Sequence, residues 1–478
     1  MLFNSIDFAI FLPIVFLLYW FVTNKHLKLQ NFLIVVASYV FYGWWDWRFL
    51  SLIVFSTLVD YTVGLYLGKE TSKNKRKALL WTSIIVNLGF LGFFKYYNFF
   101  LDNFVTAFSF FGYPISARSL NIILPVGISF YTFQTLSYSI DVYRKKLEPT
   151  KNLIAFAAFV SFFPQLVAGP IERATNLLPQ FYTKRTFNYT KAVDGLRQIL
   201  WGLFKKMVIA DNCAVLVNTV FDNHQDYSGS ALVLGAVFFA FQIYGDFSGY
   251  SDIAIGTARL FGFKLMQNFA FPYFSRDIAE FWRRWHISLS TWFRDYLYIP
   301  LGGSRGSKTK VIRNVFIIFI VSGFWHGANW TFIVWGALNA IYFLPLLLAN
   351  KNRNHLEVVA FNKKWPSLKA LLNILLTFGL TTLAWIFFRA ENINHAFQYL
   401  KGIFNKSLFS MPELRPTNIL VLLIVFIAIE WLGRRNQYAI ETFGLQWKRP
   451  LRLAFYYTII ILIFLFSRNE KTFIYFQF

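Results

Sequence analysis

The chain alternates between long apolar runs and short polar loops from one end to the other. A helix needs about 20 apolar residues to cross a bilayer, and most of the runs reach or approach that length. The pattern therefore predicts an all-α polytopic membrane protein with about eleven or twelve transmembrane helices. The expected spans are residues 3–22, 30–44, 48–67, 78–94, 120–142, 198–220, 231–258, 311–326, 331–349, 368–388, 417–433 and 451–467.

Two segments do not fit this pattern. Residues 98–112 are aromatic but too interrupted to predict a span. Residues 152–168 are apolar, yet basic loops flank them on both sides, so this run is expected to enter the membrane and return. Re-entrant backbone is tolerated only where protein or a water-filled cavity covers it. The sequence thus predicts a cavity beside this segment.

The stretch from residue 277 to residue 330 combines several features that could carry chemistry. Bulky residues recur at helical spacing between Phe281 and Tyr296, which predicts an amphipathic helix that lies in the membrane interface and carries His286. A loop rich in Gly, Lys and Arg follows, and cytoplasmic loops accumulate Lys and Arg. The apolar run from Val311 then places His326 about 20 Å along a helix, past the middle of a core about 30 Å thick.

His326 is a polar ring at a depth where polar groups are costly. Imidazole has an ordinary pKa of about 6.5, so it can take and return a proton near neutral pH. The ring could simply bond a carbonyl of a neighbouring helix, but ionisable residues inside a membrane usually mark functional sites, and we favour function here. For His286, solvation and catalysis are equally open. Gly323 and Gly327 allow either close helix packing or close approach of a substrate.

Composition and charge support a membrane protein and exclude other classes. Hydrophobic residues make up 56% of the chain and aromatic residues 21%, too much for one soluble domain. The net charge of +24 arises largely in short loops such as 69–77, as the positive-inside rule requires, so we reject nucleic acid as a partner. The run at 3–22 lacks signal-peptide features and is expected to be retained, with the N-terminus outside. The lone Cys213 is expected to be inert packing.

The motifs of soluble enzymes are missing from the sequence. It contains no phosphate-binding loop, dinucleotide fingerprint, HExxH metal motif or GxSxG elbow, so nucleotide, redox and serine-nucleophile chemistry have no support. Asp246 and Asp252 lie six residues apart on different helix faces, which favours structural bonds or cavity lining over a catalytic dyad. A histidine at depth is left, and such a general base could activate a hydroxyl for attack on an acyl carbonyl.

Several long, aromatic-rich motifs follow one another along the chain. They are FWRRWHISLSTWFRDYLYIPLGG and SGFWHGANWTFIVWG, ASYVFYGWWDWRFL at 37–50, LPVGISFYTFQTLSYSIDVYR at 124–144, FFPQLVAGPIER at 162–173, YGDFSGYSDIAIG at 244–256, WIFFRAEN, and the terminal FIYFQF. In these motifs the sequence resembles the membrane-bound O-acyltransferase family, and within it the bacterial branch typified by the membrane subunit of alginate O-acetylation. The related teichoic-acid D-alanylation branch is shorter and lacks the WIFFRA stretch, which favours the acetylation branch.

The resemblance implies one membrane domain over residues 1–478 around a central funnel. It comprises N-terminal helices at 1–143, a catalytic core at 144–349 and C-terminal helices at 350–478. It also implies that His326 is catalytic with His286 as its partner, and that no cofactor or metal is bound. Acetyl-CoA or an acylated carrier would be the donor, and we expect Arg283, Arg284 and Arg294 to attract its phosphates unless they only reach lipid headgroups. Side chains expected to line the funnel are Trp325, Asn329, Asp246, Ser248 and Asp295.

The expected function is O-acetylation of an extracytoplasmic glycan by a multi-pass protein of the bacterial cytoplasmic (inner) membrane, with a secreted or periplasmic acetyltransferase as a partner. One alternative is a transporter or flippase of an acyl group or lipid-linked sugar, which the lack of an internal repeat weakens. A second is D-alanyl-type transfer to a cell-envelope polymer. A third, an inactive scaffold, is disfavoured because both histidines are present.

Overall fold

All the regular secondary structure is helical in the residues that the computed structural model describes, which are 1–113, 115, 117–167, 169–467 and 473–474. This confirms the predicted all-α class. Within these residues, six helical runs are long and apolar enough to cross a membrane: Leu27–Lys69, Lys73–Phe110, Gly229–Leu260, Trp330–Leu348, Leu368–Arg389 and Arg449–Phe466. Three shorter apolar runs are Ile6–Val22, Leu153–Leu166 and Thr417–Gly433.

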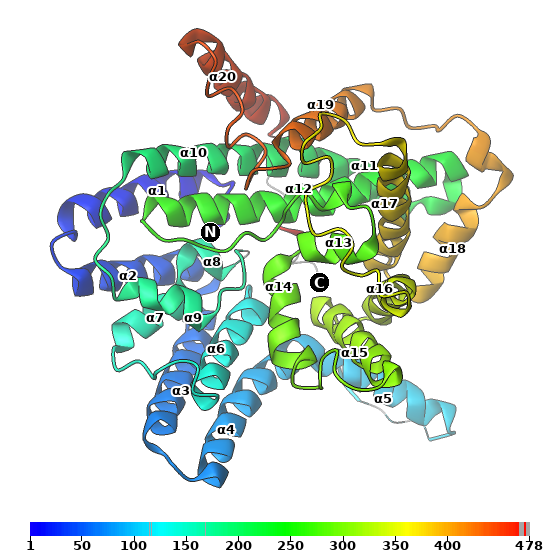
Figure 1. The fold of residues 1–478 in the computed structure, drawn as a ribbon. Helices are drawn as coiled ribbons and strands as arrows, with labels where there is room; N and C mark the ends of the chain where they lie inside the picture. Colours follow the sequence, from blue (N-terminus) through cyan, green and yellow to red (C-terminus); the bar gives the residue numbers. More distant parts are fainter. Residues whose placement is uncertain (114, 116, 168, 468–472, 475–478) are drawn as a thin grey trace. The chain divides into compact units, whose positions relative to one another are not determined.

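The chain forms two compact units. The first unit is Met1–Ala192 with Thr257–Leu265, and the second is Val193–Gly256 with Met266–Phe478. The three sequence segments expected at 1–143, 144–349 and 350–478 stay a prediction. The first unit contains α1 (Ile6–Leu17), α2 (Leu27–Asp46), α3 (Leu50–Lys69), α4 (Lys73–Leu91), α5 (Tyr97–Phe110), α6 (Ile128–Tyr143), α7 (Leu153–Ser161), α8 (Phe163–Leu166) and α9 (Ala174–Leu177), shown in Figure 1.

A buried polar cluster fixes three helices of the first unit. The carboxylate of Asp60 on α3 accepts hydrogen bonds from Ser83 and Asn87 on α4 and from Ser139 on α6, at 2.8 Å for Asn87 and 2.7 Å for Ser139. All four side chains are buried. A buried carboxylate is costly unless it is bonded, so this cluster specifies how α3, α4 and α6 pack.

Three segments of the first unit differ from or refine the sequence prediction. The span expected at 120–142 is wrong at its start, because α6 begins only at Ile128, after Pro125 and a Gly127 with φ +74°. The segment around 98–112 is largely helical, since α5 continues α4 through a π-helical turn at Gly92–Tyr96. In the expected re-entrant segment, α7 has nine residues, about 14 Å of helix, which is too short to span.

The second unit carries the central stretch of the sequence. Its helices are α10 (Tyr189–Leu203, beginning in the first unit), α11 (Asp211–Asp222), α12 (Gly229–Leu260, ending in the first unit), α13 (Ile278–Arg284), α14 (Ile287–Phe293), α15 (Lys308–His326), α16 (Trp330–Leu348), α17 (Leu368–Arg389), α18 (Ile393–Ile403), α19 (Thr417–Gly433) and α20 (Arg449–Phe466). A π-helical segment, Phe204–Ala210, joins α10 to α11.

Helices α15 and α16 form a tight hairpin, side by side in Figure 1. A Cβ atom on Gly323 would lie 2.2 Å from the carbonyl oxygen of Phe332, and one on Gly336 would lie 2.3 Å from that of Phe319. Only glycine allows the two backbones to approach so closely. Of the two roles expected for Gly323, the structure shows close packing. The hairpin turn begins at Gly327, directly after His326.

Buried ion pairs connect the π-helical segment to α12. Lys205 pairs with Asp252 at 2.5 Å, while Lys206 pairs with Asp246 at 2.7 Å and with Asp211 at 2.9 Å. The two α12 carboxylates therefore have separate cationic partners rather than forming a dyad. The structural role expected for Asp246 and Asp252 is what the contacts show.

Candidate active site

His286 lies at a break between two short helices. The continuous interfacial helix predicted here is wrong, because α13 ends at Arg284 and His286 has left-handed backbone angles, φ +43° and ψ +54°. The reason is a pairing with a distant segment: the amide of Ile287 donates to the carbonyl of Asn268 at 2.9 Å, and that of Ala270 donates to Arg284 at 3.0 Å. His286 is only 1% exposed, so it does not lie at a solvated interface.

The ring of His326 lies near that of His286. His326 is the last residue of α15 and is 3% exposed, and its ring centroid lies 6.3 Å from that of His286. Trp325 contacts both rings, at 6.0 Å from His286 and 5.0 Å from His326. Residues that are 40 positions apart in the sequence thus meet, and three of the predicted site residues form one cluster.

Aromatic rings wall the two histidines. Phe247 of α12 meets the His286 ring edge-on at 4.6 Å. Trp335 of α16 and Phe388 of α17 meet the His326 ring at 5.2 and 5.3 Å. Such walls exclude water and lower the local dielectric, which strengthens the electrostatic interactions made inside.

Neither ring nitrogen of His286 has a hydrogen-bond partner among the described residues, and both are buried. Burial lowers the pKa of His286 to about 3, so its imidazole is neutral at physiological pH. A buried polar group without a partner costs roughly 1–3 kcal/mol, and exceptions of this kind in native proteins call for an explanation. The unused donor and acceptor of His286 point to a ligand that bonds them.

Part of the C-terminal tail lies beside this cluster. The amide of Ile474 donates to the Asp246 carboxylate at 2.7 Å. Phe473 is buried, with its ring 5.8 Å from Phe247 and 4.4 Å from Tyr250. From the sequence, the tail contributed only to the resemblance and had no place in the site.

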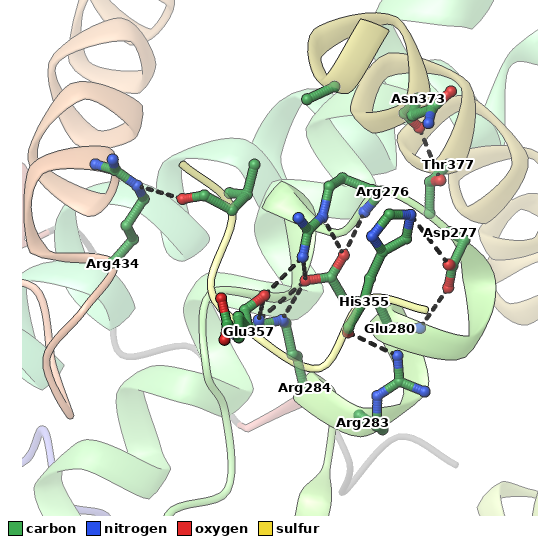
Figure 2. Close-up of polar contacts among 12 residues, drawn as sticks. Arg276, Asp277, Glu280, Arg283, Arg284, His355, Glu357, Asn373, Thr377 and Arg434 are labelled. Atoms are coloured by element: carbon green, nitrogen blue, oxygen red, sulfur yellow. Dashed lines mark hydrogen bonds and ion pairs between the residues drawn. The ribbon is translucent and has the colours of Figure 1, made fainter. Parts of the chain in front are cut away.

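Two of the predicted donor-binding arginines bond the protein itself (Figure 2). Arg283 donates to the carbonyl of Asn352 at 2.7 Å. It also donates to the carbonyl of His355 at 2.9 Å. Arg284 pairs with the buried Glu280 at 2.9 Å and donates to the carbonyl of Glu357 at 3.1 Å. These bonds hold the linker between α16 and α17. A role of Arg283 and Arg284 in donor binding stays a prediction that this geometry does not favour.

Arg294 lies in a different setting. Its side chain is 58% exposed, pairs with Asp295 at 2.7 Å, and lines a cavity of about 260 Å³ together with Arg353. Val315, Phe319 and Ser322 of α15 also line this cavity. They share with His326 the spacing of one helix face. The cavity wall therefore follows the face of α15 that ends at His326.

Comparison with known proteins identifies the family of this chain. Residues 34–388 match the MBOAT, membrane-bound O-acyltransferase family, and they are well over half of the 478 residues. The chain belongs to this family. It is therefore an O-acyltransferase and a multi-pass membrane protein, which confirms the resemblance seen in the sequence.

Several curated relatives of this O-acyltransferase are similar over most of their length. A Pseudomonas aeruginosa protein named "Probable alginate O-acetylase AlgI" is 40% identical over 446 residues, 92% of this chain and 82% of the relative. The peptidoglycan O-acetyltransferase of Helicobacter pylori is 34% identical over 529 residues, 100% of this chain and 98% of the relative. The teichoic acid D-alanyltransferase of Bacillus subtilis is 28% identical over 291 residues, 58% of this chain and 71% of the relative.

Other residues predicted to line a funnel in this O-acyltransferase have local bonds. Asn329 caps α16 by accepting from the Thr331 amide at 3.0 Å, and it donates to the carbonyl of Glu391 at 2.7 Å. The Ser248 hydroxyl donates to the carbonyl of Tyr244 at 2.5 Å on its own helix. Their lining role stays a prediction, as does that of Asp246 and Asp295. Among the described side chains, no three His, Cys, Asp or Glu converge to hold a metal ion.

Proposed function

We propose that this protein transfers an acetyl group from a cytoplasmic thioester donor toward a hydroxyl of an extracytoplasmic polysaccharide, with His326 as the general base. The observation that carries the proposal is the buried pair of neighbouring histidines, of which His286 has both ring nitrogens unused among the described residues. The acetyl group and the glycan are supported by the names of the alginate and peptidoglycan O-acetylating relatives. A bacterial cytoplasmic membrane and a secreted or periplasmic acetyltransferase partner belong to the same proposal.

The chemistry balances without a bound cofactor. His326 takes the proton of the attacking hydroxyl, and the hydroxyl oxygen bonds to the acyl carbon. A tetrahedral oxyanion forms, to which the N–H of a neutral His286 can donate. The C–S bond of acetyl-CoA, or of an acylated carrier, then breaks. The thiolate takes back the proton from the His326 imidazolium, so a new ester and a free thiol are the products.

Label transfer tests this function directly. Purified protein in lipid nanodiscs would be mixed with acetyl-CoA labelled in the acetyl group and with alginate or peptidoglycan fragments, with and without the secreted partner. We expect label in alkali-labile esters on the glycan. If the donor is never consumed and no glycan gains label under any of these conditions, the acetyl-transfer proposal is rejected, and transport of an acyl group or sugar takes its place.

We expect the acetyl donor to bind at the cavity beside α15 that Arg294 and Arg353 line. We expect the double substitution Arg294→Gln and Arg353→Gln to raise the apparent KM for acetyl-CoA roughly three- to tenfold with kcat little changed, because exposed charge pairs contribute about 1 kcal/mol or less each. Steady-state kinetics with varied donor measure this. The matched control is Arg283→Gln, which should lower thermal stability instead, since Arg283 bonds linker carbonyls. An unchanged KM in the double variant contradicts donor binding at this cavity.

A further inference from the structure

We infer that Asn268 is a positioning residue for catalysis, which acts by holding the backbone turn that presents His286. This inference rests on the proposed function, because it assigns Asn268 a role through a histidine of that site. Asn268 is 0% exposed and lies in the segment between α12 and α13. The side-chain hydrogen bonds of Asn268 go to Ser251 and Ser288 and not to either histidine ring. Its effect is therefore on the geometry of His286 rather than on the reacting atoms.

Asn268 bonds the residues that follow His286 through both its side chain and its backbone. Its Oδ1 accepts from the Ser288 amide at 3.2 Å and from the Ser288 hydroxyl at 2.8 Å. Its main-chain carbonyl accepts from Ile287 at 2.9 Å. Three hydrogen bonds thus hold the two residues immediately after His286 to a single buried residue.

The turn needs such a clamp because its backbone is strained. Left-handed backbone costs a residue with a Cβ atom roughly 1–2 kcal/mol, and strain of this kind persists only where the surroundings over-determine it. A catalytic histidine is usually oriented by a bond to one of its ring nitrogens. Neither nitrogen of His286 has such a bond in the described part of the chain. The orientation of the His286 ring therefore depends on its backbone and on ring packing.

Asn268 also connects this turn to the aromatic wall. Its Nδ2 donates to the Ser251 hydroxyl on α12 at 3.1 Å. Ser251 lies one helical turn from Phe247, whose ring meets His286 edge-on at 4.6 Å. One side chain thereby bonds both the backbone that follows His286 and the helix that supplies Phe247. Loss of the Asn268 bonds to Ser288 or to Ser251 should let the His286 ring move away from His326.

The first test is Asn268→Ala, with kcat for acetyl transfer as the readout. Removing a group that orients an active-site residue typically costs about 10- to 100-fold, and we expect that loss in kcat with the donor KM nearly unchanged. Asn212→Ala is the matched control, because Asn212 is a buried asparagine of α11 whose amide donates to the carbonyls of Met207 and Val208. It should lower thermal stability to a similar extent but leave kcat unchanged.

The decisive test is a double-mutant cycle with His286→Ala. If Asn268 acts through His286, the double variant His286→Ala with Asn268→Ala has the same kcat as His286→Ala alone. Wild-type kcat in Asn268→Ala, or a multiplied loss in the double variant, overturns the inference. Hydrogen exchange of amides 286–290 is measured in parallel. Exchange of these amides should accelerate in Asn268→Ala and not in Asn212→Ala. If exchange in Asn268→Ala is unchanged, Asn268 does not hold the turn at His286, and this result counts even if the wild type proves unable to transfer acetyl groups.

Discussion

Replacement of His326 by Ala is expected to lower kcat for acetyl transfer by roughly a hundredfold to ten-thousandfold, the range that a positioned general base contributes. The reason is that the attacking hydroxyl must lose its proton beside a buried ring, only 3% exposed, that packs against Trp335 and Phe388. No bulk solvent is available there to accept the proton. The measurement is turnover of labelled acetyl-CoA by wild type and variant in nanodiscs.

The control for this prediction is His224→Ala. His224 belongs to the same unit, and its ring bonds the side chain of Gln398 at 3.3 Å. Its loss should leave kcat unchanged. Gel filtration and helical content establish that both variants are folded. Full turnover by His326→Ala would contradict base catalysis at this residue and would leave the buried histidine pair with a structural role.

The kinetic pattern of the wild type tells how His326 works. A general base requires a single transfer step with donor and acceptor bound together, whereas an acetyl-imidazole intermediate requires two steps and gives ping-pong kinetics. The intermediate would also trap label on the protein before any acceptor is added. Both the general-base route and the acetyl-imidazole route place His326 at the reacting atoms. They differ in the role that they assign to His286.

Helix positions followed from the sequence where local hydropathy decides them. The run expected at 417–433 is α19 (Thr417–Gly433), and that expected at 368–388 is α17 (Leu368–Arg389). The break at His286 could not be seen in this way. Phe281, Trp285 and Leu289 keep helical spacing across it, while its cause is the pairing with Asn268, a contact between distant segments.

In the candidate active site, too, some residues could be predicted from the local sequence and others could not. His326 could be singled out because polar rings are rare in apolar runs, and His286 because the resemblance makes it the partner of His326. Phe247, Trp335 and Phe388 could not, because the chain contains 59 Phe and 16 Trp and nothing in the sequence marks these three. Charge alone could not show that Arg283 and Arg284 bond carbonyls of the linker between α16 and α17, because those contacts join distant segments. Their part in donor binding stays a prediction.

Substitution of Lys206 by Met is expected to lower the free energy of unfolding by about 3–5 kcal/mol, the largest stability effect that the described contacts predict. Lys206 is 1% exposed and is the ion-pair partner of both Asp211 and Asp246. Its loss leaves two carboxylates in the protein interior without this cation. Denaturation in detergent, followed by helical content, measures the change, and Arg48→Met is the control because Arg48 is 61% exposed in its pair with Asp46 and contributes about 0–1 kcal/mol.

The double variant Lys206→Met with Asp246→Asn separates the penalty of uncompensated charge from the loss of contacts. The Ile474 amide donates to the Asp246 carboxylate at 2.7 Å. Asparagine keeps an oxygen that can accept this hydrogen bond, but the asparagine side chain carries no charge. If uncompensated charge dominates, the double variant is more stable than Lys206→Met alone. If instead it is less stable, the contacts of the Asp246 carboxylate, such as its bond to the Ile474 amide, outweigh the relieved charge. The first outcome is expected, since a buried charge is far more costly than a lost contact.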